Sequence, residues 1–274
     1  MRPNAPRKRF GQHFLAAEET ISQIVAAVSP REGDTIVEIG PGRGAITGDL
    51  AKSGAAVHAV EFDRDLVPWL RERYAQLGNI SIHEADALRF DFPSLGSELR
   101  IVGNLPYNIS TPLLFRMADI SGSLRDLHFM LQKEVVDRIT ASPGTGAYGR
   151  LTIMLGCRMH SEQLFDVPAT AFRPPPKVTS SFIRLWPRKA DEMPVTDRKL
   201  MSQLVAQAFS QRRKTLRNAL RNTATPEDLA AVQIDPGSRP GEVPVTAWVT
   251  LANRLAARER APNPRGTGGQ MGIE

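Results

Sequence analysis

Short apolar runs rich in β-branched residues recur at near-even spacing through the first part of the chain, and this pattern constrains the fold more than any other feature. Each run has an acidic or polar residue at or near its end, and the runs span residues 35–40, 56–61, 80–86 and 99–104. Stretches with helical periodicity separate them, at 45–52 and 65–76. Alternating strands and helices predict an α/β fold with a parallel sheet covered on both faces.

Further elements are expected on either side of this core. An amphipathic helix is predicted over Glu18–Val28, ahead of the first strand. Apolar runs at 127–132, 151–158 and 181–186 extend the series, and the last two suit a partly antiparallel closing end of the sheet, although 151–158 mixes helix and strand character. A helical pattern over 197–221 follows a polar, proline-containing stretch.

The length of the chain predicts one large and one small domain. It has 274 residues, of which 41% are hydrophobic, and single cores stop growing at roughly 250–300 residues. We expect the large domain over 1–190, with a basic arm at 1–9, and a small helical domain over 195–260. The glycine- and proline-rich tail, 261–274, has no apolar pattern to pack and is expected to be disordered.

Composition points to a cytoplasmic protein with a polyanionic partner. Cys157 is the only cysteine, which excludes an internal disulfide and a multi-cysteine metal site, and we expect no metal. No apolar run approaches the roughly 20 residues of a membrane span, so no membrane partner is expected. The net charge is +6, and the basic excess lies at the ends: residues 195–260 carry 11 basic and 6 acidic side chains, and 1–9 carry no acid.

Three acids and a glycine-rich turn outline a cofactor site. Glu38, Glu61 and Asp86 stand near the carboxyl ends of successive predicted strands, where ligands bind in open parallel sheets. The turn Gly40-Pro41-Gly42-Arg43-Gly44 follows the first strand and lets the backbone pass close to a ligand. Because Gly40, Gly42 and Ala45 also satisfy the dinucleotide pattern G-x-G-x-x-A, the turn alone does not decide the cofactor.

The surplus of negative charge favours S-adenosylmethionine over a dinucleotide. Glu38 and Asp86 would repel a pyrophosphate, but they suit a cofactor that carries a sulfonium and an ammonium. Glu61 would accept the ribose hydroxyls, with bonds worth about 1.5–3 kcal/mol each, and Asp86 would receive the adenine amine.

The segment Asn104-Leu105-Pro106-Tyr107, at the end of the fourth predicted strand, is the most specific signal. An adenine amine is a poor nucleophile because its lone pair is delocalised into the ring. The Asn104 side-chain oxygen and the Leu105 carbonyl, in a turn stiffened by Pro106, could accept the hydrogens of this amine and direct its lone pair at the sulfonium methyl. Tyr107 could stack on the base. No histidine base is required, because the proton leaves after the nitrogen becomes cationic.

Several linked motifs together resemble the small-subunit (16S) rRNA adenine-N6,N6-dimethyltransferase family. They are RKRFGQHFL (7–15), VEIGPGRG (37–44), GNLPYNIST (103–111), LQKEVVDRI (131–139) and FRPPPKV (172–178). The resemblance spans about residues 7–255. It implies a Rossmann-like class I methyltransferase sheet with a small all-helical C-terminal domain, and transfer of two methyl groups to each of two adjacent adenosines near the 3′ end of 16S rRNA, in small-subunit biogenesis.

The resemblance also implies roles for individual residues. Cofactor contacts fall on His13, Leu15, Gly40, Glu61, Asp86 and Asn104, to which the site argument above adds Glu38 and Gly42. The family usually has asparagine at the position of His13, and a neutral imidazole can still make one hydrogen bond there. Phe172 is implied to stack on the target base opposite Tyr107, returning part of the cost of flipping the base.

Basic residues predict the RNA contacts. Arg213, Arg217 and Arg221 lie at i, i+4 and i+8 and are expected to share one face of the predicted helix. With their neighbours and the N-terminal arm they form a candidate phosphate-binding set, whose strength should fall steeply with salt. The set is Arg7, Lys8, Arg9, Arg212, Arg213, Lys214, Arg217 and Arg221.

These observations predict a monomeric rRNA adenine dimethyltransferase that acts on 16S rRNA in the small ribosomal subunit or its precursor. One alternative is a large-subunit rRNA adenine methyltransferase of the antibiotic-resistance type, which shares the Asn-x-Pro-Tyr motif. Another is a non-catalytic assembly factor that binds RNA. A third, an NAD-linked oxidoreductase, leaves the segment Asn104–Tyr107 and the basic ends unexplained.

Overall fold

The structure is a computed structural model that describes residues 13–260. They divide into two compact units, one of residues 13–141 and 158–188 and the other of 142–157 and 189–260. The predicted basic arm at 1–9 and the tail from Ala261 lie outside the described residues.

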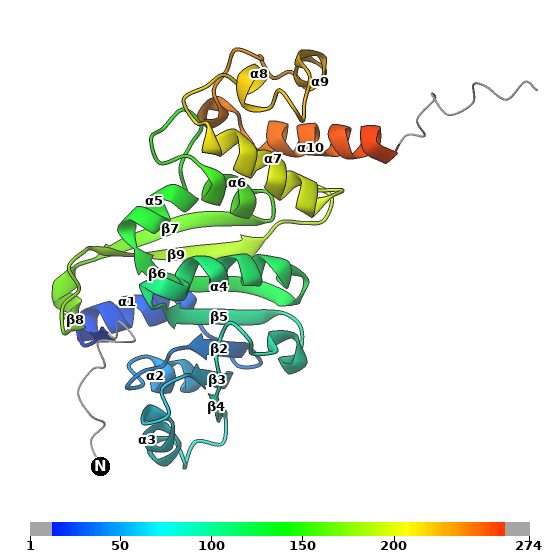
Figure 1. The fold of residues 1–274 in the computed structure, drawn as a ribbon. Helices are drawn as coiled ribbons and strands as arrows, with labels where there is room; N and C mark the ends of the chain where they lie inside the picture. Colours follow the sequence, from blue (N-terminus) through cyan, green and yellow to red (C-terminus); the bar gives the residue numbers. More distant parts are fainter. Residues whose placement is uncertain (1–12, 261–274) are drawn as a thin grey trace, which may run out of the picture. The chain divides into compact units, whose positions relative to one another are not determined.

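The first unit is built on a seven-stranded sheet. Its strands, in chain order, are β2 (Thr35–Ile39), β3 (Ala56–Glu61), β4 (Ile80–Glu84), β5 (Leu99–Asn104), β6 (Leu124–Gln132), β7 (Met159–Val167) and β9 (Ser180–Pro187). In space they follow the order β4-β3-β2-β5-β6-β9-β7 (Figure 1). The strands β4, β3, β2, β5 and β6 pair in parallel, and β9 is antiparallel to both β6 and β7. The predicted parallel sheet with an antiparallel end is confirmed.

Helices cover both faces of this sheet. The helices of the unit are α1 (Glu18–Val28), α2 (Thr47–Ala51), α3 (Leu66–Arg73), α4 (Tyr107–Asp119) and α5 (Lys133–Ile139). Ile36 and Val37 are adjacent on β2, so their side chains point to opposite faces, yet neither is exposed. On the Ile36 face, Ile24 of α1 and Leu50 of α2 join the buried cluster. Continuous apolar strands such as TIVEI are therefore the sequence signature of burial on both sides.

The prediction of a strand within 151–158 is wrong in part. This run forms the helix α6 (Arg150–Gly156), which begins after Gly149, and the backbone N–H of Gly149 donates to Thr152 Oγ1 at 3.0 Å. The edge strand is instead β7, which the sequence analysis missed. Only the first and last residues of β7, Met159 and Val167, are buried. The strand therefore lacks the apolar run that marks the inner strands, which explains why the sequence analysis missed it.

The second unit contains only helices among its described residues. They are α6, α7 (Arg198–Ser210), α8 (Leu216–Ala219), α9 (Pro226–Ala230) and α10 (Val245–Arg260). The sequence-based boundary at 190 placed 142–157 in the first domain, whereas the structure groups this segment with the second unit. Hydrogen bonds connect it to the rest of that unit. For example, Tyr148 Oη donates to the Val243 carbonyl at 2.7 Å, and the Gly144 N–H donates to the Gly241 carbonyl at 2.8 Å.

The prediction of one continuous helix over 197–221 is also wrong. Helix α7 ends at Ser210, and the chain turns before α8 begins. At the start of α8 the N–H groups of Leu216 and Arg217 donate to the carbonyls of Ser238 and Pro236, at 2.8 and 3.1 Å. Those donors are therefore not bonded within a helix that continues α7. Arg213 lies in the turn, Arg217 in α8 and Arg221 beyond it, so they do not share one helix face.

Candidate active site

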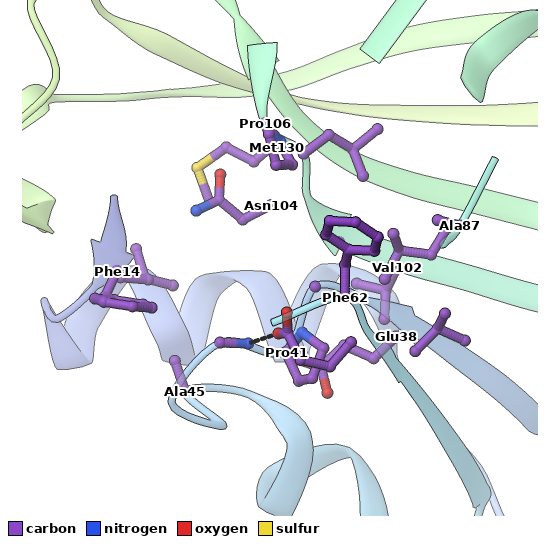
Figure 2. Close-up of a pocket in the computed structure, with 18 of the residues that line it drawn as sticks. Phe14, Glu38, Pro41, Ala45, Phe62, Ala87, Val102, Asn104, Pro106 and Met130 are labelled. Carbon is purple, nitrogen blue, oxygen red and sulfur yellow. Dashed lines mark hydrogen bonds between the residues drawn. The ribbon is translucent and has the colours of Figure 1, made fainter. Parts of the chain in front are cut away.

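A cavity of about 340 Å³ opens at the carboxyl ends of β2, β3 and β5. The predicted cofactor residues and the Asn104 segment gather around it. Figure 2 shows Asn104, Met130 and Pro106 on one side of the cavity and Glu38 and Pro41 on the other, with the Phe62 ring between them in this view. The structure thus brings together residues that lie as far apart in sequence as His13 and Phe172.

The glycine-rich turn follows β2 in a conformation that side chains resist. Gly42 has a φ of 57°, and a Cβ at this position would lie 3.0 Å from Cδ1 of Phe14. The Gly40 N–H donates to the Val60 carbonyl of β3 at 2.9 Å, which fixes where the turn leaves the sheet. Glycine at position 42 therefore allows both the left-handed backbone and the close approach of an aromatic ring.

Glu61 ends β3 and fixes the shape of the loops around it. Its Oε2 accepts the Gly42 N–H at 3.1 Å and its Oε1 accepts the Asp63 N–H at 2.8 Å. Burial raises the pKa of Glu61, and the two N–H bonds oppose that rise. Each carboxylate oxygen retains a second lone pair, which leaves room for the predicted ribose hydroxyls.

Glu38 is a buried acid in the wall of the cavity. It is 3% exposed, and among residues 13–260 its Oε2 has no hydrogen-bond partner. Desolvation raises the pKa of Glu38 to about 7. The nearby Thr47 hydroxyl opposes this rise in pKa, and the negative charge on Glu61 adds to it. An unpaired buried carboxylate is costly, and a cationic group in the cavity would relieve that cost. The site therefore fits a positively charged cofactor.

Asp86 follows β4 and opens a turn. Its Oδ1 accepts the Leu88 N–H at 2.8 Å, and its carbonyl accepts the Arg89 N–H at 2.8 Å. The first bond orients the carboxylate and leaves Oδ2 for a ligand. Asp86 is half-buried and lines the cavity, as the adenine assignment requires.

The segment from Asn104 leaves the sheet at the end of β5, beside the end of β2. A Cβ on Gly103 would lie 2.6 Å from the Ile39 carbonyl, so glycine lets β5 end close against β2. The Leu105 N–H donates to the Met130 carbonyl at 3.2 Å, and Pro106 caps the start of α4. Asn104 Nδ2 donates to the His13 carbonyl at 3.0 Å. Tyr107 is the first residue of α4, and its side chain lies outside what the structure describes.

The N-terminal and FRPPPKV motifs meet at this cavity. The strand β1 (Phe14–Leu15) pairs antiparallel with β8 (Phe172–Arg173), with Leu15 opposite Phe172. The Phe172 side chain is 1% exposed and lines the cavity. A base could therefore stack on Phe172 only from within the cavity.

The sequence analysis overlooked several residues that line the cavity. Phe62, directly after Glu61, is 58% exposed, which is unusual for a large apolar side chain. Phe14 and Asp63 also line the cavity. An aromatic residue directly after an acid that is predicted to bind ribose, at the carboxyl end of a parallel strand, is the signal that could have identified Phe62.

The described basic residues of the second unit differ in their surroundings. All five of the predicted phosphate-binding residues among them are exposed, namely Arg212, Arg213, Lys214, Arg217 and Arg221. The Arg212 guanidinium is partly engaged, because its Nη2 lies 2.8–3.3 Å from the carbonyls of Thr145, Gly146 and Tyr148. Arg7, Lys8 and Arg9 lie outside the described residues.

Three features together define a class I methyltransferase that uses S-adenosylmethionine. They are the order of the strands in the sheet, the acids at the ends of three parallel strands, and the Asn104 segment at the end of a fourth. Comparison with known proteins identifies the family within this class. Residues 4–257 match the ribosomal RNA adenine dimethylase family. The chain belongs to the ribosomal RNA adenine dimethylase family, and the dinucleotide-binding alternative is thereby rejected.

Close relatives extend over nearly the whole chain. The chain is 52% identical over 255 residues to ribosomal RNA small subunit methyltransferase A of Thiobacillus denitrificans, covering 93% of this chain and all of the relative. It is 49% identical to the protein of the same name in Pseudomonas aeruginosa, with 91% and 94% covered.

Solved structures share the fold. A dimethyladenosine transferase from Plasmodium falciparum superposes with a TM-score of 0.81 at 23% identity, covering 90% of this chain and 98% of that one. The 23S rRNA methyltransferase ErmE superposes with a TM-score of 0.69 at 26% identity, covering 89% and 99%.

Proposed function

We propose that this protein transfers methyl groups from S-adenosylmethionine to the N6 amines of two adjacent adenosines near the 3′ end of 16S rRNA, two to each. The observation that carries the proposal is the position of Asn104 at the rim of the cavity that also holds Glu38, Glu61 and Asp86. The names of the relatives that are about 50% identical support the small-subunit substrate. The 26% identity to ErmE makes the large-subunit alternative weaker.

The protein's contribution to the reaction is positioning. When bound, S-adenosylmethionine supplies an electrophilic methyl group on a cationic sulfur. Glu61 would hold the ribose, Asp86 the adenine amine and Glu38 the positive charge of the cofactor. These contacts would place the methyl carbon opposite Asn104.

The target amine would be held by two acceptors. Asn104 Oδ1 and the Leu105 carbonyl accept its hydrogens, which raises the electron density on N6. The amine lone pair, directed by these two acceptors, would take the methyl group that the cofactor supplies, and the cofactor's sulfur would leave as the neutral thioether. The cationic nitrogen then releases one proton to water. A second transfer to the monomethylated amine would proceed in the same way, with its one remaining hydrogen held by one of the two acceptors.

The target base would be stacked and the RNA backbone held by separate parts of the chain. Phe172 would contact the base within the cavity, with Tyr107 on its other face. Arg213, Lys214, Arg217 and Arg221, with the N-terminal arm, would bind phosphates. We assign Arg212 instead to holding the loop 145–148, because that loop engages its Nη2. The first unit would then be the methyltransferase domain and the second an RNA-binding domain, in a cytoplasmic monomer.

Asn104→Ala tests this assignment. The substitution removes the side-chain acceptor, so methyl transfer should fall at least about 100-fold, the usual cost of one oriented group in an active site. The dissociation constant for S-adenosylmethionine should change only a few-fold. Turnover that stays near wild type would reject the acceptor role of Asn104.

A further inference from the structure

The Asn104 amide is held in one orientation by the backbone of a distant residue. Its Nδ2 donates to the His13 carbonyl, 91 positions earlier in the chain, at 3.0 Å. A carbonyl oxygen can only accept a hydrogen bond, so the NH₂ group must face His13. The Oδ1 atom is thereby turned to the other side of the amide, where it is the acceptor for a target amine.

The His13 carbonyl belongs to a short segment fixed at several points, which we call the N-terminal strap (residues 13–17). Its central part is β1, paired with β8. Beyond β1, the N–H groups of Ala16 and Ala17 both donate to the Ala171 carbonyl, at 2.8 and 3.2 Å. The strap is therefore attached along its length to the chain around β8.

The ring of His13 supplies the attachment at the other end. Its Nδ1 lies 2.8 Å from the Pro174 carbonyl. Because that oxygen accepts, Nδ1 carries the hydrogen, a condition met by one neutral tautomer and by the imidazolium alike. The contact therefore does not depend on the charge of the ring. An asparagine at this position, as the family usually has, also carries an N–H donor.

The strap also contacts the glycine-rich turn. The Phe14 ring packs against Gly42, and the Arg43 guanidinium lies over the same ring at 4.8 Å from its centroid. His13, Phe14 and Leu15 all line the cavity that Asn104 lines. The strap therefore contacts the glycine-rich turn (40–44), the strand β8 and the Asn104 side chain. Phe14 and Asn104 are both labelled in Figure 2.

We propose that the N-terminal strap selects the catalytic orientation of the Asn104 amide, with His13 as the positioning residue. Without the carbonyl acceptor, the amide could rotate by 180° and present NH₂ to the target amine, so that a donor would face a donor. This inference rests on the proposed function, since it assumes that Asn104 accepts hydrogens from the amine. It assigns His13 a role beyond cofactor contact.

Asn104→Asp tests the donor of the amide separately from its acceptor. The carboxylate keeps an acceptor for the target amine but places a second oxygen against the His13 carbonyl. Its negative charge would favour the cationic amine that forms, so charge alone predicts no loss. We expect kcat to fall about 100-fold, with cofactor affinity changed only a few-fold. We also expect kcat to recover as pH is lowered, since a protonated carboxyl can donate to the carbonyl. Wild-type kcat with a wild-type pH profile would overturn the proposal.

His13 variants test the same contact from the other side. His13→Ala should lower kcat more than it weakens cofactor binding, and His13→Asn should restore kcat. Combining His13→Ala with Asn104→Asp should cost no more than Asn104→Asp alone, because both act through one hydrogen bond. Additive losses, or no rescue by His13→Asn, would reject the strap's role. Absence of methylation by the wild type would reject the proposed function as well, so the two failures are distinguishable.

Discussion

Proton release on cofactor binding follows from the surroundings of Glu38. Burial and the neighbouring Glu61 hold the pKa of Glu38 at about 7, so near neutral pH the empty site is a mixture of protonated and ionised forms. The other titratable or charged side chains lining the cavity are His13, Arg43, Asp63 and Asp86. A cofactor with positive charge should bind the ionised form. Binding must then displace the proton.

The expected size of the effect follows from this value. With a pKa of about 7, roughly one Glu38 in eleven is ionised at pH 6 and ten in eleven at pH 8, so the affinity for S-adenosylmethionine should rise about tenfold between them, or about 1.4 kcal/mol. Glu38→Gln cannot titrate and should bind more weakly with a flatter pH profile. Titration of other groups, including the cofactor's ammonium, is common to both proteins and cancels in the comparison.

Isothermal titration calorimetry measures both quantities. At pH 7 the binding enthalpy of the wild type should vary with the ionisation enthalpy of the buffer by about half a proton more than that of Glu38→Gln. If both proteins show the same pH dependence and the same buffer dependence, Glu38 does not titrate with cofactor binding and the reasoning is refuted.

Two further predictions concern stability and RNA binding. Desolvation lowers the pKa of His128 to about 4; unfolding therefore takes up a proton between pH 4 and about 6.5, and stability should fall by up to about 3 kcal/mol as pH drops through that window. Urea unfolding should show a smaller fall for His128→Phe, and an equal fall in both proteins would exclude His128. Replacing Arg213, Lys214, Arg217 and Arg221 together by Ala should weaken 16S rRNA binding and flatten its salt dependence by about 0.7–0.9 per lost phosphate contact. Arg212→Ala should flatten it less, and an unchanged slope in the quadruple variant would contradict phosphate binding.

The parallel core was predictable because its strands carry their own signal. β3 and β5 match the predicted runs at both ends, and α1 matches at Glu18 and Val28. Both strands are buried over most of their length, so each holds apolar residues at consecutive positions, Ala59-Val60 in β3 and Ile101-Val102 in β5. The edge strand β7 is only partly buried and carried no comparable pattern.

The second unit was harder to predict because its breaks depend on distant partners. The sequence QRRKTLRNALR has no proline or glycine to end a helix. The turn before α8 is instead stabilised by carbonyls of Pro236 and Ser238, which no local pattern indicates. Likewise, the sequence could not show that Arg212 Nη2 donates to carbonyls of the loop 145–148.

The site was predictable in its acids but not in its connections. Glu38, Glu61 and Asp86 were found because strand ends meet at one edge of a parallel sheet. The hydrogen bond between Asn104 and the His13 carbonyl was not, because a backbone group leaves no trace in residue identity. Phe62 was missed although its neighbour Glu61 was identified, since an isolated aromatic residue is more often buried.

The most direct measurement is mass spectrometry of nucleosides and mapped fragments from small ribosomal subunits that lack adenine dimethylation, after incubation with this protein and S-adenosylmethionine carrying a labelled methyl group. We expect four labelled methyl groups, two on each of two adjacent adenosines near the 3′ end of 16S rRNA, and labelling at least about 100-fold slower with Asn104→Ala. Label on 23S rRNA alone, or wild-type protein that leaves 16S rRNA unlabelled, would contradict it.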